Sequence, residues 1–165
     1  MRISALMIVT TLSLPSFSFA AGTAGISVSL SPAGSFVAHS ETVQGSATKT
    51  GADSYTAQGV TLELDTLKTG IDLRDRHMRD KYFETKKYPR ATLRSGKAQG
   101  GKFEGELEVH GKTKKISGPY EVKGQKITGK FKCALSDFGI AAAKYMGVGV
   151  DDEVEVEIQL PIAAK

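Results

Sequence analysis

Hydrophobic and polar residues alternate along most of the chain, the pattern of β-strands with one buried and one solvated face. The clearest case is 153–160, where Val, Ile and Leu alternate with Glu and Gln. Gly-rich and polar turns separate the alternating stretches, and such short connections predict antiparallel pairing. About eight strands of this kind must close into a barrel or form a sandwich, because an open sheet leaves unpaired edges.

One segment, residues 69–89, departs from this pattern because it is densely charged. Asp72 is placed to cap a helix, and Asp75 is spaced to pair with Arg79. Pro89 disfavours helical geometry at the residue before it. We predict one short helix lying across the end of the β structure, although a solvated crossover between two strands fits the local pattern equally well. Three residues fall on one face of this helix: Arg74, Met78 and Tyr82.

Charged residues on the polar faces are sorted by strand. Lysines occupy the polar face of 127–135, at 130 and 132, and glutamates occupy that of 153–160, at 153, 155 and 157. Opposite charges that face each other across a strand pair contribute roughly 0.2–1 kcal/mol each, enough to select a register. We therefore expect these two strands to be neighbours.

Glycine occupies the apolar face on three successive strands, at Gly105, Gly118 and Gly129. An inward glycine lets a strand bend at a barrel corner, or it leaves interior space unfilled. We favour bending, and the two interpretations are compatible. Unfilled space would give an apolar lumen, since a barrel of about eight strands is just wide enough for one small or slender ligand.

The first 20 residues have the features of a signal peptide. Arg2 precedes an apolar run, and Ser18-Phe19-Ala20 carries the small residues that signal peptidase requires. We expect a signal peptide over 1–20, a single domain over 21–165, and a periplasmic or secreted location. The apolar run is too short to span a bilayer and has no nearby lipidation cysteine, so no stable membrane anchor is expected. Interspersed charges argue against a nucleic-acid partner.

Residues that carry catalysis or metal binding in known motifs are scattered. The three histidines, His39, His77 and His110, lie on different elements without metal-ligand spacing, so neither a metal site nor a cofactor is predicted. No nucleophile elbow or phosphate-binding loop occurs, and we predict no enzymatic activity. Cys133 is the single cysteine and lies on an apolar face, which predicts a buried, inert thiol.

Three blocks of sequence resemble the YceI-like family. They occur in the order and spacing of the family over roughly two-thirds of the chain. The blocks are Thr69-Gly70, Arg74-Asp75-x-His77-Met78-Arg79 and Lys87-Tyr88-Pro89; Gly105-x-Leu107-x-Val109-x-Gly111-x-Thr113-Lys114; and Leu135-x-Asp137-Phe138-Gly139-Ile140. The resemblance implies an all-β, lipocalin-like antiparallel barrel with a helix across one end. It also implies export, binding of a polyisoprenoid or similar long amphiphilic lipid in the lumen, and homodimers in some members.

The function that these features favour is an exported carrier or binding protein for an isoprenoid or fatty lipid. The alternative is a filled barrel that acts in stress protection or protein interaction without a lipid ligand. For each candidate wall residue, plain core packing is the competing role. The candidate wall residues are Leu62, Leu64, Leu107, Val109, Tyr120, Phe131, Phe138, Tyr145 and Met146. The candidate head-group contacts at the mouth are Arg74, Arg79 and Lys144.

Overall fold

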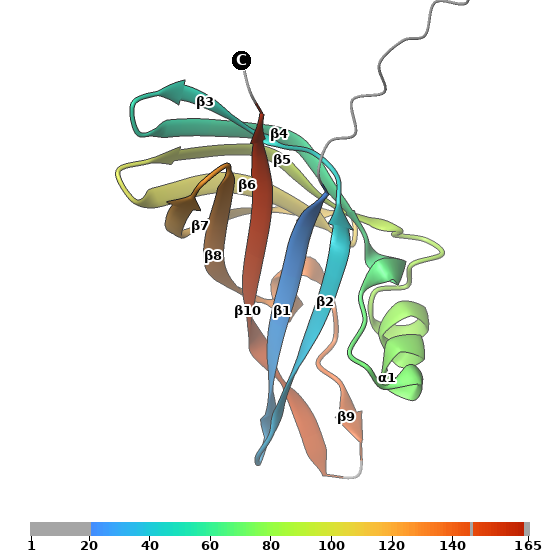
Figure 1. Ribbon diagram of the computed structural model, residues 1–165. Coiled ribbons are helices and arrows are strands. Elements are labelled where there is room, and N and C mark those ends of the chain that lie inside the picture. Colours follow the sequence, from blue (N-terminus) through green and yellow to red (C-terminus); the bar gives the residue numbers. More distant parts are fainter. Residues whose placement is uncertain (1–20, 146, 164–165) are drawn as a thin grey trace, which may run out of the picture.

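The computed structural model describes residues 21–145 and 147–163, so the predicted signal peptide and Met146 lie outside the described residues. The described part is built mainly from strands, with one α-helix (Figure 1). Its strands are β1 (Gly22–Ser31), β2 (Ser35–Val43), β3 (Ala47–Gly51), β4 (Ser54–Glu63), β5 (Arg90–Gln99), β6 (Lys102–Val109), β7 (Lys112–Lys123), β8 (Lys126–Ala134), β9 (Lys144–Tyr145) and β10 (Val148–Ala163). The helix α1 (Asp72–His77) continues into a π-helical turn, Met78–Tyr82, and 3₁₀ turns cover Leu64–Thr66 and Leu135–Phe138.

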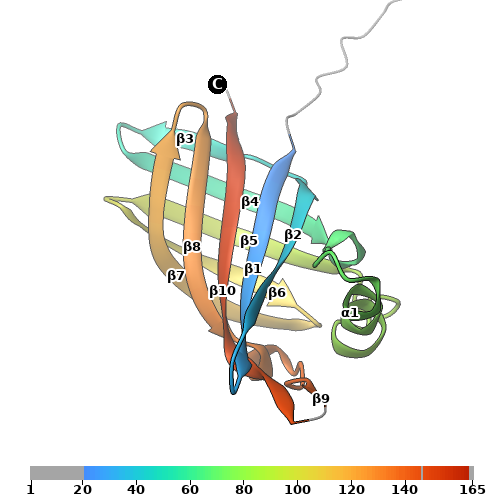
Figure 2. The same ribbon diagram turned by 60° about the horizontal axis from the view of Figure 1, so that its bottom comes forward.

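Seven strands close into a barrel, in the order β10-β3-β4-β5-β6-β7-β8 and back to β10. All neighbours in this ring are antiparallel except β10 and β3, which run parallel where Ile162 pairs with Ala47. The hairpin of β1 and β2 pairs with β10 and extends past the ring (Figure 2). The predicted antiparallel barrel is therefore confirmed, with ten strands in the described part of the chain.

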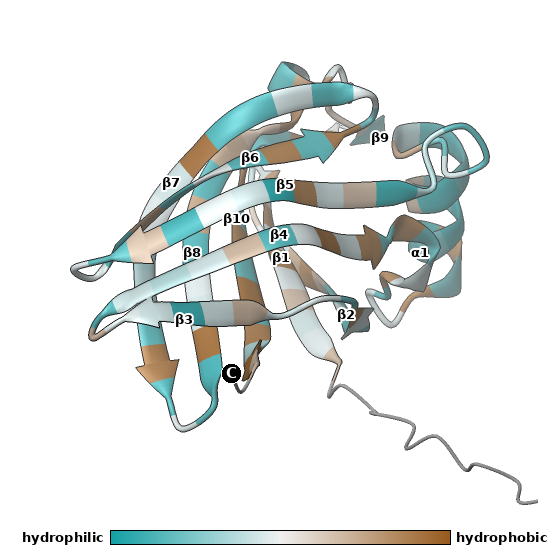
Figure 3. Cartoon of the chain, turned by 90° about the horizontal axis from the view of Figure 1, so that it is seen from above, coloured by the Kyte–Doolittle hydropathy of each residue, from teal (hydrophilic) through white to brown (hydrophobic). Residues whose placement is uncertain are grey.

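The strand alternation of the sequence places hydrophobic side chains inside the barrel. Figure 3 shows hydrophobic and hydrophilic residues alternating along the strands. The largest fully buried side chains are Val43, Val60, Leu64 and Leu67. Burying a side chain of this size stabilises the fold by about 1.5–3 kcal/mol, so these four residues form a firmly packed part of the core.

The charge sorting correctly predicted the pairing of β8 with β10. In the observed register Lys130 faces Glu157, and Lys132 faces Glu155. Lys130 Nζ lies 2.9 Å from Glu157 Oε2, whereas Lys132 Nζ reaches diagonally to Glu153 Oε1 at 2.8 Å. These exposed ion pairs select the register more than they stabilise the fold.

The predicted helix is present at the end of the barrel where β4 ends and β5 begins (Figures 1 and 2). The predicted cap is wrong, because Ile71 occupies the N-cap position and Asp72 is already the first helical residue. Asp75 is 4% exposed, and it accepts hydrogen bonds from Thr69 N at 2.8 Å and Thr69 Oγ1 at 2.6 Å. The loop before the helix folds back over α1, so Asp75 bonds this loop in place of the predicted pairing with Arg79.

The inward glycines allow close approach of neighbouring groups. A Cβ on Gly118 would lie 1.9 Å from the main-chain oxygen of Lys130, and one on Gly105 would lie 2.7 Å from that of Ser95. At these two positions only glycine permits such close contact between strands. At Gly129, which lines the cavity described below, a Cβ would lie 3.1 Å from the ring of Phe103, so this ring packs against the glycine.

Candidate functional site

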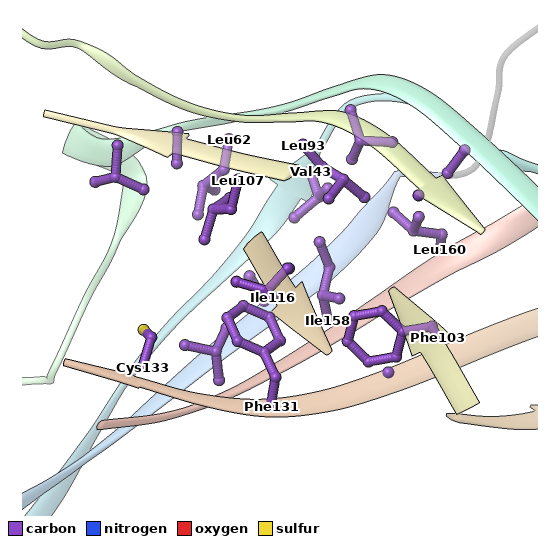
Figure 4. A pocket seen from close by; sticks show the side chains of 18 of the residues that line it. Val43, Leu62, Leu93, Phe103, Leu107, Ile116, Phe131, Cys133, Ile158 and Leu160 are labelled. Carbon is purple, nitrogen blue, oxygen red and sulfur yellow. The ribbon is translucent and has the colours of Figure 1, made fainter. Parts of the chain in front are cut away.

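The barrel encloses an apolar cavity of about 160 Å³, which we call the barrel cavity. Its walls come from both sides of the ring, and Figure 4 shows aliphatic and aromatic side chains converging on the space from opposite strands. Five alanines line it where bulkier residues would fill the interior: Ala24, Ala47, Ala57, Ala91 and Ala98. Sequence reasoning did not single out these alanines, although they stand at inward positions of their strands.

The structure brings most of the predicted wall residues together. Seven of the nine line the barrel cavity: Leu62, Leu64, Leu107, Val109, Tyr120, Phe131 and Phe138. Tyr145 belongs to the short strand β9, and Met146 lies outside the described residues. Whether these residues contact a ligand stays a prediction.

Aromatic residues close the end of the barrel cavity that lies far from the helix. The rings of Tyr55 and Tyr120 are 6.0 Å apart in an edge-to-face arrangement, and Phe103 and Phe131 form a similar pair at 6.0 Å. Tyr120 donates a hydrogen bond to Asp53 Oδ1 at 2.9 Å, which satisfies its hydroxyl. Burial, followed by this contact, raises the pKa of Tyr120 above its ordinary value. A neutral, fully bonded hydroxyl keeps this end of the cavity apolar.

The helical end opens into a larger space of about 570 Å³, which we call the mouth groove. The groove lies between the β1–β2 hairpin, α1 and the segment 135–150. It adjoins the barrel cavity, because five residues line both: Ile26, Phe83, Leu135, Ile140 and Val154. Phe83 directly follows the π-helical turn and is 8% exposed, so the turn positions an aromatic ring between the two spaces. The sequence pattern gave no signal for this role of Phe83.

Basic residues line the mouth groove, and two of the three predicted head-group contacts are among them. Arg74 and Lys144 line the groove, whereas Arg79 does not. The guanidinium carbon of Arg74 lies 4.2 Å from the centre of the Phe36 ring, a cation–π contact that holds it against β2. His77 and Lys81 also line the groove and were missed. Their spacing of three and seven residues from Arg74 puts them on the same helical face, which the sequence could have revealed.

Asp75 has a structural position in this site. The hydrogen bond from the Thr69 hydroxyl is the main cause that lowers the pKa of Asp75, and burial opposes it. The ionised carboxylate bonds the segment that carries Ile71 to the helix, so it shapes the mouth groove without lining it.

Cys133 also lines the barrel cavity, beside Phe131 on β8 (Figure 4). Burial raises the pKa of its thiol to about 11, and Asp137 and Asp152 add to the shift. The thiol is therefore protonated at neutral pH, which makes it a poor nucleophile and a small apolar wall residue.

Clusters of metal-ligating side chains and membrane-spanning helices would point to other functions. Across 21–145 and 147–163, no group of three or more His, Cys, Asp or Glu side chains is placed to hold a metal ion. None of the helices in this part of the chain is long and apolar enough to cross a membrane.

Comparisons with known proteins agree with this architecture. The family model of the YceI-like domain matches residues 16–162. A polyisoprenoid binding domain from Saccharophagus degradans, implicated in plant cell wall breakdown, is similar with a TM-score of 0.61 and 16% identity, over 87% of this chain and 94% of that one. BcnA of Burkholderia cenocepacia is similar with a TM-score of 0.63 and 19% identity, over 85% and 96%. No curated protein matches this chain.

Proposed function

The chain belongs to the YceI-like domain family, and we propose that it binds one long-chain amphiphilic lipid of the polyisoprenoid class. The observation that carries the proposal is an apolar barrel cavity that adjoins a basic mouth groove. The tail lies in the barrel cavity, and the polar head lies near Arg74 and Lys144. The relative from Saccharophagus degradans, described as polyisoprenoid binding, supports the choice of ligand class.

The two volumes indicate how such a ligand is shared between the spaces. A cavity of about 150 Å³ is known to hold benzene, so the barrel cavity takes only the end of a tail. The mouth groove has the volume of a typical small-molecule site, about 300–1,000 Å³, and takes the remainder. Each buried CH₂ contributes about 0.8 kcal/mol, so a few isoprene units provide useful affinity without specific polar contacts in the barrel.

We propose that the protein is exported before it binds lipid, in the periplasm or outside the cell. The described strands begin at Gly22, so removal of residues 1–20 would leave every one of them intact. Intact mass measurement of protein expressed in a Gram-negative host tests this proposal. A mature chain that starts at Ala21 is the expected result, and a full-length cytoplasmic chain would contradict it.

Native mass spectrometry and uptake of a fluorescent isoprenoid test lipid binding. We expect a co-purifying mass of a few hundred daltons that organic extraction removes, and saturable uptake by the extracted protein. The same spectra report whether the protein forms the homodimer that the resemblance to the family implies. A clean apoprotein mass together with no uptake would refute the proposal and favour a barrel that acts without a lipid.

A cavity-filling variant assigns the binding to the barrel cavity. Ala91 lines the cavity on β5, and Thr92, the next residue, does not. We expect Ala91→Phe to weaken isoprenoid binding at least about tenfold, which corresponds to the burial of roughly two CH₂ groups. Thr92→Phe is the matched control and should bind within about twofold of the native protein. Equal affinities in the two variants would place the ligand elsewhere.

A further inference from the structure

Large hydrophobic side chains are exposed around the entrance of the mouth groove. Ile71 is 50% exposed, Leu73 58% and Val148 42%, and all three line the groove. The other exposed large hydrophobic side chains among the described residues are Val37, at 51%, and Val122, at 38%, and neither lines the groove. These residues, which we call the apolar rim, come from two segments far apart in sequence, yet Figure 1 shows α1 and β9 at the same end of the molecule.

The charged side chains that line the mouth groove are all basic, although exposed Asp72, which does not line the groove, stands between Ile71 and Leu73 in the sequence. Arg74, His77, Lys81 and Lys144 line the mouth groove, and the described lining contains no carboxylate. Two carboxylates on the neighbouring elements are engaged elsewhere. Asp75 is buried and bonded to Thr69, and Asp152 accepts a hydrogen bond from Ser136 N at 2.8 Å.

We propose that the apolar rim and the basic residues behind it form a docking surface for an anionic lipid bilayer. Exposed apolar side chains flanked by cations are the pattern of peripheral binding, in which the apolar groups enter the head-group region and the cations face lipid phosphates. A surface with three apolar side chains binds reversibly, which distinguishes it from an anchor. Docking does not require an occupied barrel cavity, so it goes beyond the proposed lipid binding.

Docking in this orientation sets the mouth groove against the membrane. A lipid tail that leaves the bilayer then passes along the groove toward Phe83 and the barrel cavity without crossing water. Exposing each CH₂ of such a tail to water is unfavourable, so this route lowers the barrier to loading and release.

Flotation with lipid vesicles tests the docking surface. Native protein is expected to bind vesicles of equal parts phosphatidylcholine and phosphatidylglycerol, to bind pure phosphatidylcholine at least about tenfold more weakly, and to dissociate as salt is raised. The variant that combines Lys81→Gln with Lys144→Gln is expected to bind anionic vesicles about 25-fold more weakly, since each basic residue near an anionic surface strengthens binding about fivefold.

The apolar contribution is tested by Ile71→Ser with Leu73→Ser. This variant is expected to bind at least about tenfold more weakly, and its fold is preserved because serine is a favoured N-cap residue. The matched control is Val37→Ser with Val122→Ser, which removes two exposed apolar groups outside the groove and should bind within about twofold of native protein. Thermal unfolding confirms that each variant is folded.

Three outcomes would overturn the docking proposal. They are no binding to either kind of vesicle, equal binding to both, and an equal loss of binding in the rim and control variants. The variant Ala91→Phe separates vesicle docking from lipid binding in the barrel cavity. It should still float with vesicles although it takes up little isoprenoid. Conversely, native protein that takes up isoprenoid from solution but does not float with vesicles would refute docking alone, so either proposal can fail without the other.

Discussion

The hydrogen-bonded contact between Asp75 and Thr69 gives the sharpest test of the structure. The buried carboxylate accepts two hydrogen bonds, at 2.8 Å from the main-chain N–H and 2.6 Å from the hydroxyl. A hydrogen bond to a charged group contributes about 1.5–3 kcal/mol, and the desolvation of the carboxylate offsets part of the total. We expect Asp75→Asn, which keeps one acceptor but loses the charge, to lower the free energy of unfolding by about 1–3 kcal/mol at pH 7.

The pH dependence of this loss follows from the pKa of Asp75. The Thr69 hydroxyl, opposed by burial and assisted by the Thr69 amide, Lys68 and Arg79, lowers the pKa in the folded state. The unfolded value is about 3.9. Stabilisation by the carboxylate is therefore present in full above the unfolded pKa and is lost as the pH falls through the folded pKa. The difference between native protein and Asp75→Asn should shrink as the pH falls from about 5 to about 2.

Urea unfolding at a series of pH values measures this difference. The control is Asp80→Asn, which removes an exposed carboxylate from the π-helical turn that follows α1 and should change stability by less than about 0.5 kcal/mol. A difference between native protein and Asp75→Asn that stays constant with pH would contradict the assigned cause. If Asp80→Asn lowered the free energy of unfolding as much as Asp75→Asn, the loss would come from removing any negative charge near the helix, and not from the hydrogen bonds to Thr69.

Three further predictions follow from the barrel. Iodoacetamide should modify Cys133 far more slowly in folded than in unfolded protein at pH 8, because the pKa of the thiol is about 11 in the folded state. Bound lipid should slow the modification further. Modification of the folded protein at the rate of the unfolded protein would contradict the burial of Cys133. Gly118→Ala should lower the free energy of unfolding in urea by about 3 kcal/mol or more, because the added Cβ would lie 1.9 Å from a main-chain oxygen. The control Gly25→Ala, whose Cβ would lie 3.9 Å from the nearest atom, should change the stability little. Lys132→Glu should lower the midpoint of urea unfolding slightly, because it places a like charge beside Glu153, and a loss that does not diminish with added salt would contradict an electrostatic origin.

The parts of the fold that depend on periodic patterns were predictable from the sequence. Alternation places Leu62, Leu107 and Phe131 inside a closed antiparallel barrel, and the sorted charges set the register of β8 against β10. These inferences succeed because side-chain direction in a strand has a fixed period of two residues. Charge pairing then adds information about which strands meet.

The features that depend on loop geometry were not predictable. Asp75 has the spacing of a helical ion pair, and its burial against Thr69 depends on a loop that folds back over the helix. Phe83 reaches the barrel cavity because a π-helical turn changes its direction. The exposure of Ile71 and Leu73 likewise depends on where the helix lies against the barrel. No local pattern of polar and apolar residues encodes these positions.

The position of β10 has a consequence for biosynthesis. This strand borders β1, β3, β8 and β9, and all four precede it in the chain. The ring therefore cannot close until residues 148–163 have been synthesised. A nascent chain that lacks them has unpaired strand edges and contacts of high sequence separation still to form, both of which delay folding. Late closure of this kind would suit the proposed export, since a chain that passes through a membrane channel must stay unfolded until its passage is complete.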